Sequence, residues 1–410
     1  MADLGRVRDD PERTLRRGSA APGYTAEVVD RIAALDRVEE FHRTHPAHPA
    51  SHLALLRAGF LSGWKSTPFF VQVARDGEPC LLMVGQLVRE RLRWRLGYGI
   101  TLASPARTIL VRRGGLLGDV ARPALEFLRE YLDELLRRGT ADAIHLRDLP
   151  SGSGVEDVFA SYSHWLWRDR SPATTTNWRL RVPASFDEWQ DAKSRRERED
   201  TKRYDKRIRR DVGDAVRVEI VRQLADVDRA AEVADQIARK TYQRGIGAGF
   251  RDSAPVRARW RAGASEGALD VRLLWFGDQP VAYTCGFVFE GTLWLEHLGY
   301  DPAFRRFRPG MFLLLRLIED LAGRGDVHTI DFGIGDADYK RRLCDQHSEM
   351  VSVYVFAPTL RGLWLNSLRA TASGLGRVSR ACLGRLGLLP WVRSSWRRSL
   401  EPGDRRAANQ

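Results

Sequence analysis

The chain has 410 residues, of which 43% are hydrophobic and 29% are charged, as in ordinary folded proteins. Its length predicts about two domains. No stretch supplies the roughly 20 apolar residues that a membrane-spanning helix needs. The four cysteines are far apart and indicate neither a disulfide framework nor a zinc site, which fits a protein of the reducing cytoplasm.

The formal net charge of the chain is +13. Such an excess favours an anionic partner, namely the phosphates of CoA or of a nucleotide, RNA, or an acidic membrane surface. Residues 1–22 carry charges but no apolar run, so we expect a disordered leader rather than a signal peptide.

The first half is expected to be α+β, with a sheet formed before its long helix. Apolar spacing, turn residues and alternation predict the following elements: a helix at Ala26–Phe41, a helix at Leu53–Gly63, a hairpin of Phe69–Ala74 and Pro79–Val88, strands at Leu92–Ile100 and Thr108–Val111, an amphipathic helix at Ala121–Arg138 and a strand at Ala143–Leu146. The connector His42–His52 holds four histidines but no cysteine or close carboxylate, and no metal site is predicted there.

The second half repeats this layout. Its expected elements are strands at Tyr162–Asp169 and Asn177–Val182, a charged helical segment at Phe186–Asp211, a strand at Val216–Val221, a helix at Val227–Tyr242, a meander of Val271–Phe276, Val281–Phe289 and Thr292–Gly299, a helix at Met311–Ala322, and strands at His328–Phe332 and Met350–Phe356. Because both halves run from a helical start through a meander to a long helix and a closing strand, we expect a duplicated domain.

The segment Trp294–Lys340 carries the clearest chemical signal. A strand leads into a turn with three arginines, Arg305, Arg306 and Arg308, and the turn ends in Pro309-Gly310 before an apolar helix. Pro suits a helix entry, Gly lets a ligand approach the backbone, and the first free N–H groups of a helix attract phosphate. With guanidinium groups beside them, these features predict an anion site.

At this point the chain resembles a known family. The meander, the Arg-x-x-Pro-Gly turn, the apolar helix and the ending Asp331-Phe332-Gly333-x-Gly335-Asp336-x-x-Tyr339-Lys340 resemble the GNAT acetyltransferase superfamily, and specifically its CelD/BcsL-like branch, which is associated with cellulose or envelope polysaccharide biosynthesis. The resemblance implies two tandem GNAT-like domains, as in the Fem peptidyltransferases, each with a mostly antiparallel mixed sheet flanked by helices. The expected boundaries are 23–180 for a degenerate domain, 181–357 for a catalytic domain and 358–410 for a tail.

The resemblance implies acyl transfer from acetyl-CoA or another acyl-CoA, without a metal, to an amine or hydroxyl. His297 or Glu296 would be the base, His297 being preferred, and strand alternation predicts that only one of them faces the site. Asp336 would orient the acceptor or the base, and Tyr339 would protonate the leaving thiolate. The residues expected to bind the cofactor are Arg305, Arg306, Arg308, Gly310, Met311 and Lys340. Phe307 departs from the family pattern, because the usual residue three positions before this glycine is Gln or Arg.

The acceptor implied by the family is a sugar, an amino sugar or another envelope precursor. Two alternatives stay open: Fem-like transfer from aminoacyl-tRNA, and a non-catalytic module of a polysaccharide synthase. Acids offset the bases of Lys193–Arg210, so nucleic acid is not the favoured partner. From Thr359 onward the tail has ten arginines and two acids, which predicts either a basic amphipathic helix on an anionic membrane, over about 359–400, or a capping helix with a disordered end.

Overall fold

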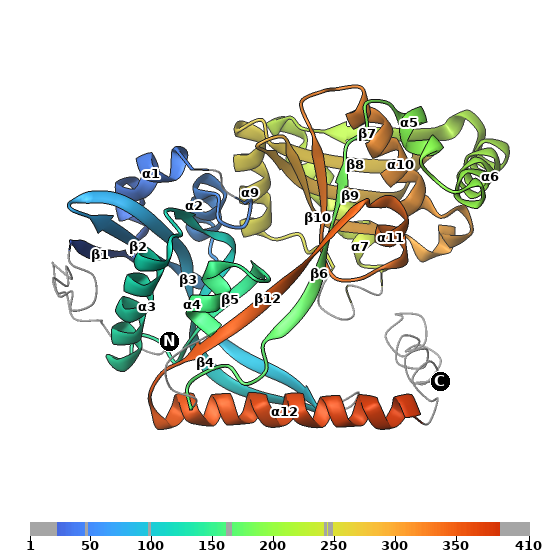
Figure 1. Cartoon of the computed structure of the whole chain (residues 1–410). Coiled ribbons are helices and arrows are strands. Elements are labelled where there is room, and N and C mark those ends of the chain that lie inside the picture. The colour runs from blue at the N-terminus through green and yellow to red at the C-terminus, as the bar shows by residue number, and fades with distance from the viewer. Residues whose placement is uncertain are drawn as a thin grey trace, which may run out of the picture.

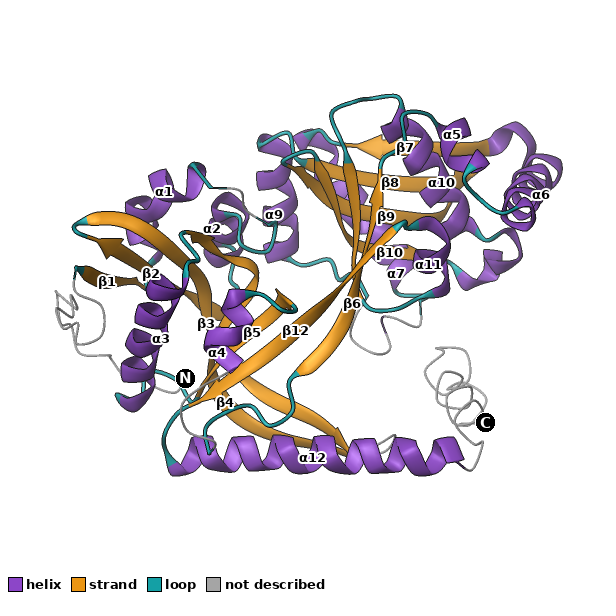
Figure 2. Ribbon diagram, in the orientation of Figure 1, coloured by secondary structure: helices purple, strands orange, loops and turns teal. Residues whose placement is uncertain are grey.

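A computed structural model describes residues 23–45, 48–96, 100–160, 166–241, 244 and 249–385. The expected leader 1–22 and the end of the tail lie outside this range. The described strands form one twelve-stranded sheet with helices on both faces, which is the α+β class predicted from the sequence (Figures 1 and 2).

The first half contains these elements: β1 (Tyr24–Val29), η1 (Ile32–Val38), α1 (Glu39–Arg43), α2 (Leu53–Leu61), β2 (Ser66–Arg75), β3 (Glu78–Leu96), β4 (Ile100–Gly118), α3 (Arg122–Arg137), β5 (Ala143–Pro150), α4 (Gly154–Ala160) and β6 (Ala173–Arg181). Helix α3 buries one apolar face against β2 to β5, and α2 with η1 covers the other face of the sheet.

The second half contains α5 (Phe186–Asp191), α6 (Arg195–Val212), η2 (Gly213–Ala215), β7 (Val216–Val221), η3 (Leu224–Asp226), α7 (Val227–Ala238), α9 (Ala254–Ser265), β8 (Leu269–Phe276), β9 (Gln279–Phe289), β10 (Thr292–Tyr300), η4 (Pro302–Phe307), α10 (Pro309–Ala322), β11 (Thr329–Ile334), α11 (Asp338–Leu343), β12 (Gln346–Phe356) and α12 (Leu360–Arg385). Helices α7 and α9 cover one face of this half of the sheet, and α10 covers the other.

The two halves exchange a strand. The strand order is β1-β2-β3-β4-β5-β12-β6-β11-β10-β9-β8-β7, so each half contributes a similar run of five strands. The sixth place beside β5 is taken by β12, which comes from the end of the second half, while β6 pairs with β11. Strands β6 and β12 also pair with each other and cross between the halves (Figure 1). The exchange joins the halves through continuous main-chain hydrogen bonds.

Three expected elements differ from the observed ones. The helix expected at Ala26–Phe41 is wrong, because Tyr24–Val29 is a strand that pairs with β2 and only the η1–α1 part is helical. Of the strand expected at Leu92–Ile100, the part up to Leu96 belongs to β3 and residues 97–99 lie outside the described residues, and Thr108–Val111 belongs to β4; β3 and β4 are 19 residues each. Long-range pairing extends these strands well beyond their alternating apolar residues. Part of the strand expected at Tyr162–Asp169 lies outside the described residues.

The charged segment Phe186–Asp211 forms two helices. Ser194 begins α6 with a capping box in which Glu197 bonds back to its backbone, so the chain restarts a helix there. The predicted stripe is buried: Trp189, Tyr204 and Ile208 face the core. Most of the remaining charges of this segment are solvent-exposed and form ion pairs along the helix.

Helix α12 lies along the ends of β3 and β4 at one edge of the molecule (Figure 1). Its inner face buries Leu365 and Asn366, and Arg369 forms a buried ion pair with Asp169. On its outer side Leu360 and Trp364 are 88% and 61% exposed. No described helix has the length and apolarity to cross a bilayer.

Candidate active site between the two halves

The end of β10 is shaped by a β-bulge. Its register with β9 shifts between Leu295 and His297, which leaves Glu296 as an extra residue without a counterpart. Gly286 allows this close approach, because a Cβ there would lie 2.2 Å from the carbonyl oxygen of Trp294. Strand β10 pairs with β11 only over Thr292–Trp294, and the pairing ends there.

A cleft of about 580 Å³ lies where β10 and β11 separate, between the two halves of the chain. The first half contributes His48, Ala50, Arg112, Arg113, Arg147 and Asp148. The second half contributes Gly249, Arg259, the run Trp294–Leu298, the run Asp331–Ile334, Tyr339 and Lys340. Glu296 and His297 therefore both line the cleft. The expectation that only one of them faces it does not hold, because the bulge interrupts the strand alternation.

The carboxylate of Glu296 is held by Arg259 of α9. The two terminal nitrogens of Arg259 donate to the carboxylate oxygens at 2.8 and 3.4 Å. Burial alone would raise the pKa of Glu296, but the charge and hydrogen bonds of Arg259 outweigh it and leave the pKa below its usual value. Glu296 is therefore an anion at neutral pH.

His297 adjoins this pair and contacts the edge of the Phe250 ring at 5.9 Å between ring centroids. Burial lowers its pKa, the charge of Glu296 opposes that effect, and Arg259 adds to it. With its pKa lowered, the imidazole is neutral at pH 7 and can accept a proton. A basic nitrogen next to a fixed carboxylate in a cleft is suited to general base chemistry.

Asp331 of β11 is the first residue of the segment Asp331–Lys340, and its hydrogen bonds connect β11 with two other strands. Its buried carboxylate accepts hydrogen bonds from Arg113 of β4 and from Asn177 and Arg179 of β6. Arg113 also lies over the ring of Trp294, 5.0 Å from its centroid. This network holds the two halves together at the cleft. The carboxylate of Asp331 therefore has a structural role.

The other predicted site residues of the segment Asp331–Lys340 lie in different surroundings. Lys340 is buried and donates to the backbone carbonyls of Gly333 and Ile334, which stabilises the loop after β11. Tyr339 lines the cleft and packs against Phe332. Asp336 is exposed, does not line the cleft and forms an ion pair with Arg341. The structure thus brings Tyr339 and Lys340 to Glu296 and His297, but not Asp336.

The predicted anion turn lies beyond the cleft, where β10 continues into η4 and α10. Arg305, Arg306 and Arg308 are exposed and do not line the cleft. The guanidinium of Arg308 stacks over Tyr204 of α6, and Arg308 has a left-handed φ of 51°. Phe307, the residue that departs from the family pattern, is buried in the core beside Phe276, so it has a packing role.

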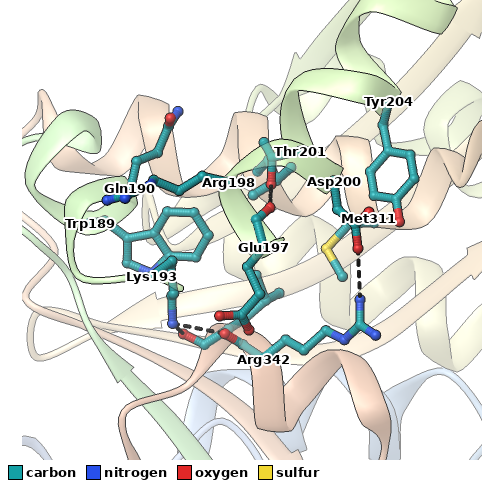
Figure 3. A pocket seen from close by; sticks show the side chains of 12 residues that line it. Trp189, Gln190, Lys193, Glu197, Arg198, Asp200, Thr201, Tyr204, Met311 and Arg342 are labelled. Carbon is teal, nitrogen blue, oxygen red and sulfur yellow. Dashed lines mark hydrogen bonds and ion pairs between the residues drawn. The ribbon is translucent and has the colours of Figure 1, made fainter. Parts of the chain in front are cut away.

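Gly310 is buried, and a Cβ there would be 3.4 Å from Tyr300 and 3.9 Å from Leu298, the last cleft residue of β10. The start of α10 is therefore next to the cleft. Met311 instead lines a separate cavity of about 30 Å³ under α5 and α6, together with Trp189 and Tyr204 (Figure 3). A cavity of that volume has room for little more than a water molecule.

The comparisons with known proteins now identify part of the chain. Residues 195–341 match the family model described as an acetyltransferase (GNAT) domain. The matched segment contains β10, the bulge, α10 and β11, so the cleft residues of the second half all lie within it. No curated protein sequence matches the chain significantly.

The fold of the chain resembles that of a solved structure, FemX. A crystal structure of FemX has a TM-score of 0.50 and 14% identity, covering 77% of this chain and 95% of its own. A tandem GNAT protein from the clavulanic acid biosynthesis pathway scores 0.47 at 14% identity, covering 82% and 99%. L-PGS from Bacillus licheniformis scores 0.48 at 10% identity, covering 86% and 99%. At these identities the likeness to FemX shows the fold alone.

Several cleft residues were not predicted from the sequence. Arg112, Arg147 and Arg259 are three arginines in an arginine-rich chain, and they lie on β4, β5 and α9 without a local motif. His48 was considered only as part of a histidine cluster; it contacts Trp294 edge-on with the ring centroids 4.4 Å apart. The described residues contain no group of three or more potential metal ligands.

Proposed function

We propose that this protein is an acyl-CoA-dependent acyltransferase that acts on an amine or hydroxyl at the bulged end of β10. The observation that carries the proposal is the placement of Glu296 and His297 together in a cleft of the GNAT domain, next to the start of α10. Acyl-CoA supplies the acyl group as an activated thioester when it is bound.

In this proposal His297 accepts the proton of the attacking amine or hydroxyl. Its lowered pKa keeps it in the basic form at neutral pH. Glu296, fixed by Arg259, stabilises the positive charge that then develops on the imidazole. Tyr339, which also lines the cleft, donates a proton to the departing sulfur. Lys340 holds the loop after β11 in place through the carbonyls of Gly333 and Ile334.

The start of α10 fits the phosphates of the acyl donor. The first turn of a helix has free N–H groups, and Arg306 and Arg308, which lie over the rings of Phe307 and Tyr204, form no ion pair with a described carboxylate, nor does Arg305. Free N–H groups and unpaired guanidinium groups both favour a phosphate. The backbone runs directly from the cleft into this region, so the donor would lie along β10 and reach both places.

The acceptor is proposed to be a sugar, an amino sugar or another envelope precursor, on the resemblance to the CelD/BcsL-like branch alone. Aminoacyl-tRNA as the donor, and a non-catalytic role, are the competing proposals. Isothermal titration with acetyl-CoA and with a tRNA mixture separates the three. Binding of acetyl-CoA with a dissociation constant on the order of micromolar supports acyl-CoA use. Binding of tRNA without acetyl-CoA favours the second proposal, and binding of neither favours the third.

We also propose that the outer side of α12 rests on an anionic membrane. Leu360, Trp364 and Leu375 are exposed, and helical geometry places them within about 60° of arc. The sequence of α12 has no acidic residue, so the helix complements a negatively charged surface.

A further inference from the structure

The first half of the chain supplies one wall of the cleft, and it does so through a wide bulge in β4. The register of β4 with β3 passes from Leu116 opposite Met83 to Val111 opposite Gly85. The β4 residues between these pairs, 112–115, therefore outnumber the single intervening β3 residue, and the backbone bulges outward. Arg112 and Arg113 are the first two residues of this bulge, and both line the cleft.

The two adjacent arginines differ in how their charge is compensated. Arg113 forms an ion pair with Asp331 at 2.9 Å and bonds to Asn177. Arg112 has no ion pair or hydrogen bond among the described residues, and its Nε is buried without a partner. Burial lowers the pKa of Arg112 most, the charges of Arg147 and Arg259 also lower it, and Glu296 and Asp148 raise it, which together leave the pKa at about 10.

Arg147 of β5 is the second cation of this wall. Its nearest carboxylate is its neighbour Asp148, at 4.0 Å from Nε, and its side chain is 38% exposed. The register of β5 with β12 also shifts next to these residues, and Asp148 has a left-handed φ of 58°. Arg147 is thus presented to the cleft without a close hydrogen-bonded ion pair, although the carboxylates of Asp148 and Glu90 both act on its charge.

The charges that line the cleft do not balance. Its cations are Arg112, Arg113, Arg147, Arg259 and Lys340, and its carboxylates are Asp148, Glu296 and Asp331. Glu296 and Asp331 are already bound by other cations, which leaves Asp148 in the cleft and Glu90 of β3 outside its lining as the carboxylates that act on Arg112 and Arg147. A partly buried guanidinium without a counter-ion is costly, so such a group is normally found with an anion.

We infer that Arg112 and Arg147 form an anion-binding subsite of the acceptor, and that the acceptor therefore carries a carboxylate or phosphate group. This inference rests on the proposed acyltransferase function and narrows its acceptor to anionic molecules. Guanidinium groups bind carboxylate and phosphate through paired hydrogen bonds, so two of them on one wall orient the acceptor as well as attract it. His297 lines the same cleft, so the anion would anchor the acceptor while its amine or hydroxyl reaches the base.

The test uses inorganic phosphate as the probe and thermal unfolding of the full chain as the readout. Melting temperatures are measured in sodium phosphate and in sodium chloride at equal ionic strength. The variant is Arg112→Gln/Arg147→Gln. The control is Arg137→Gln/Arg138→Gln, which removes the same charge from the exposed surface of α3.

Phosphate is expected to raise the melting temperature of the wild type and of the control by about 2 °C more than that of the cleft variant. In chloride the cleft variant should melt no lower than the wild type, because it loses two positive charges that repel each other. All three proteins keep the phosphate site proposed at α10 and share the general stabilising effect of phosphate. Both contributions therefore cancel when the shifts in melting temperature are compared. An equal phosphate effect in all three overturns the inference.

Two measurements keep this result interpretable. If the double variant does not fold, as judged by circular dichroism, Arg147→Gln alone carries the test, since its side chain is the more exposed of the two. Acetyl-CoA binding is measured by titration in the same proteins and should not change. A phosphate effect that depends on Arg112 and Arg147, without acetyl-CoA binding, supports the anion subsite and sinks the acyl-CoA proposal. Acetyl-CoA binding together with an equal phosphate effect in all three proteins supports the acyl-CoA proposal and overturns the anion subsite.

Discussion

Replacing Arg259 by Gln tests the electrostatics of the site most directly. Arg259 and Glu296 are 15% and 23% exposed, and two donor–acceptor contacts of 2.8 and 3.4 Å join them. Removing one member of such a pair leaves a desolvated charge behind. Because solvent still reaches both groups, we expect the free energy of unfolding at pH 7.5 to fall by about 2 to 3 kcal/mol, below the full cost for a buried pair.

The loss should depend on pH in a defined direction. The pKa of Glu296 is depressed in the folded protein, so the pair stabilises the fold above the unfolded pKa of about 4.3, and this is lost as pH falls through the folded value. Without Arg259, burial dominates and the pKa of Glu296 should rise above its usual value. The stability difference between wild type and Arg259→Gln is therefore largest at pH 7.5 and shrinks towards pH 4.

Urea unfolding of both proteins at several pH values measures this difference. The matched control is Arg259→Gln/Glu296→Gln. It leaves no carboxylate without its partner cation, so it should be more stable than Arg259→Gln at pH 7.5. Two outcomes would refute the assignment of Arg259 as the group that keeps Glu296 ionised. Arg259→Gln could have the same free energy of unfolding as the wild type, or it could lose the same amount of that free energy at pH 4.5 and at pH 7.5.

Three further outcomes are expected. His297→Ala should lower acyl transfer by about 10²-fold or more while acetyl-CoA still binds, and His328→Ala, at an exposed position outside the cleft, should not; equal rates in the two variants would exclude His297 as the base. Arg308→Ala should weaken acetyl-CoA binding by about tenfold, and unchanged titration would remove the phosphate site from α10. Trp364→Asp should abolish most cosedimentation with phosphatidylglycerol vesicles, whereas Leu61→Asp, an equally exposed apolar position on α2, should leave it intact; a similar loss in both would contradict the membrane role of α12.

Local patterns predicted much of the second half. The apolar run of α10, the meander before it and the Pro309-Gly310 entry are encoded within a few residues of one another, and the structure has these elements. The same reasoning failed for Ala26–Phe41. There the first residues pair with β2, some 45 residues away, and that pairing decided between strand and helix.

The sequence by itself determined the α+β class, the repeated layout of the two halves and the segment of the chain that holds Glu296, His297 and Tyr339. Only the tertiary structure decided that β6 and β12 exchange places and that bulges turn Arg112 and Glu296 into one cleft. The physical reason is range: periodicity and turn chemistry act between neighbours in the chain, whereas the cleft depends on contacts such as Arg113 with Asp331, 218 residues apart. Register and charge compensation are set by those contacts.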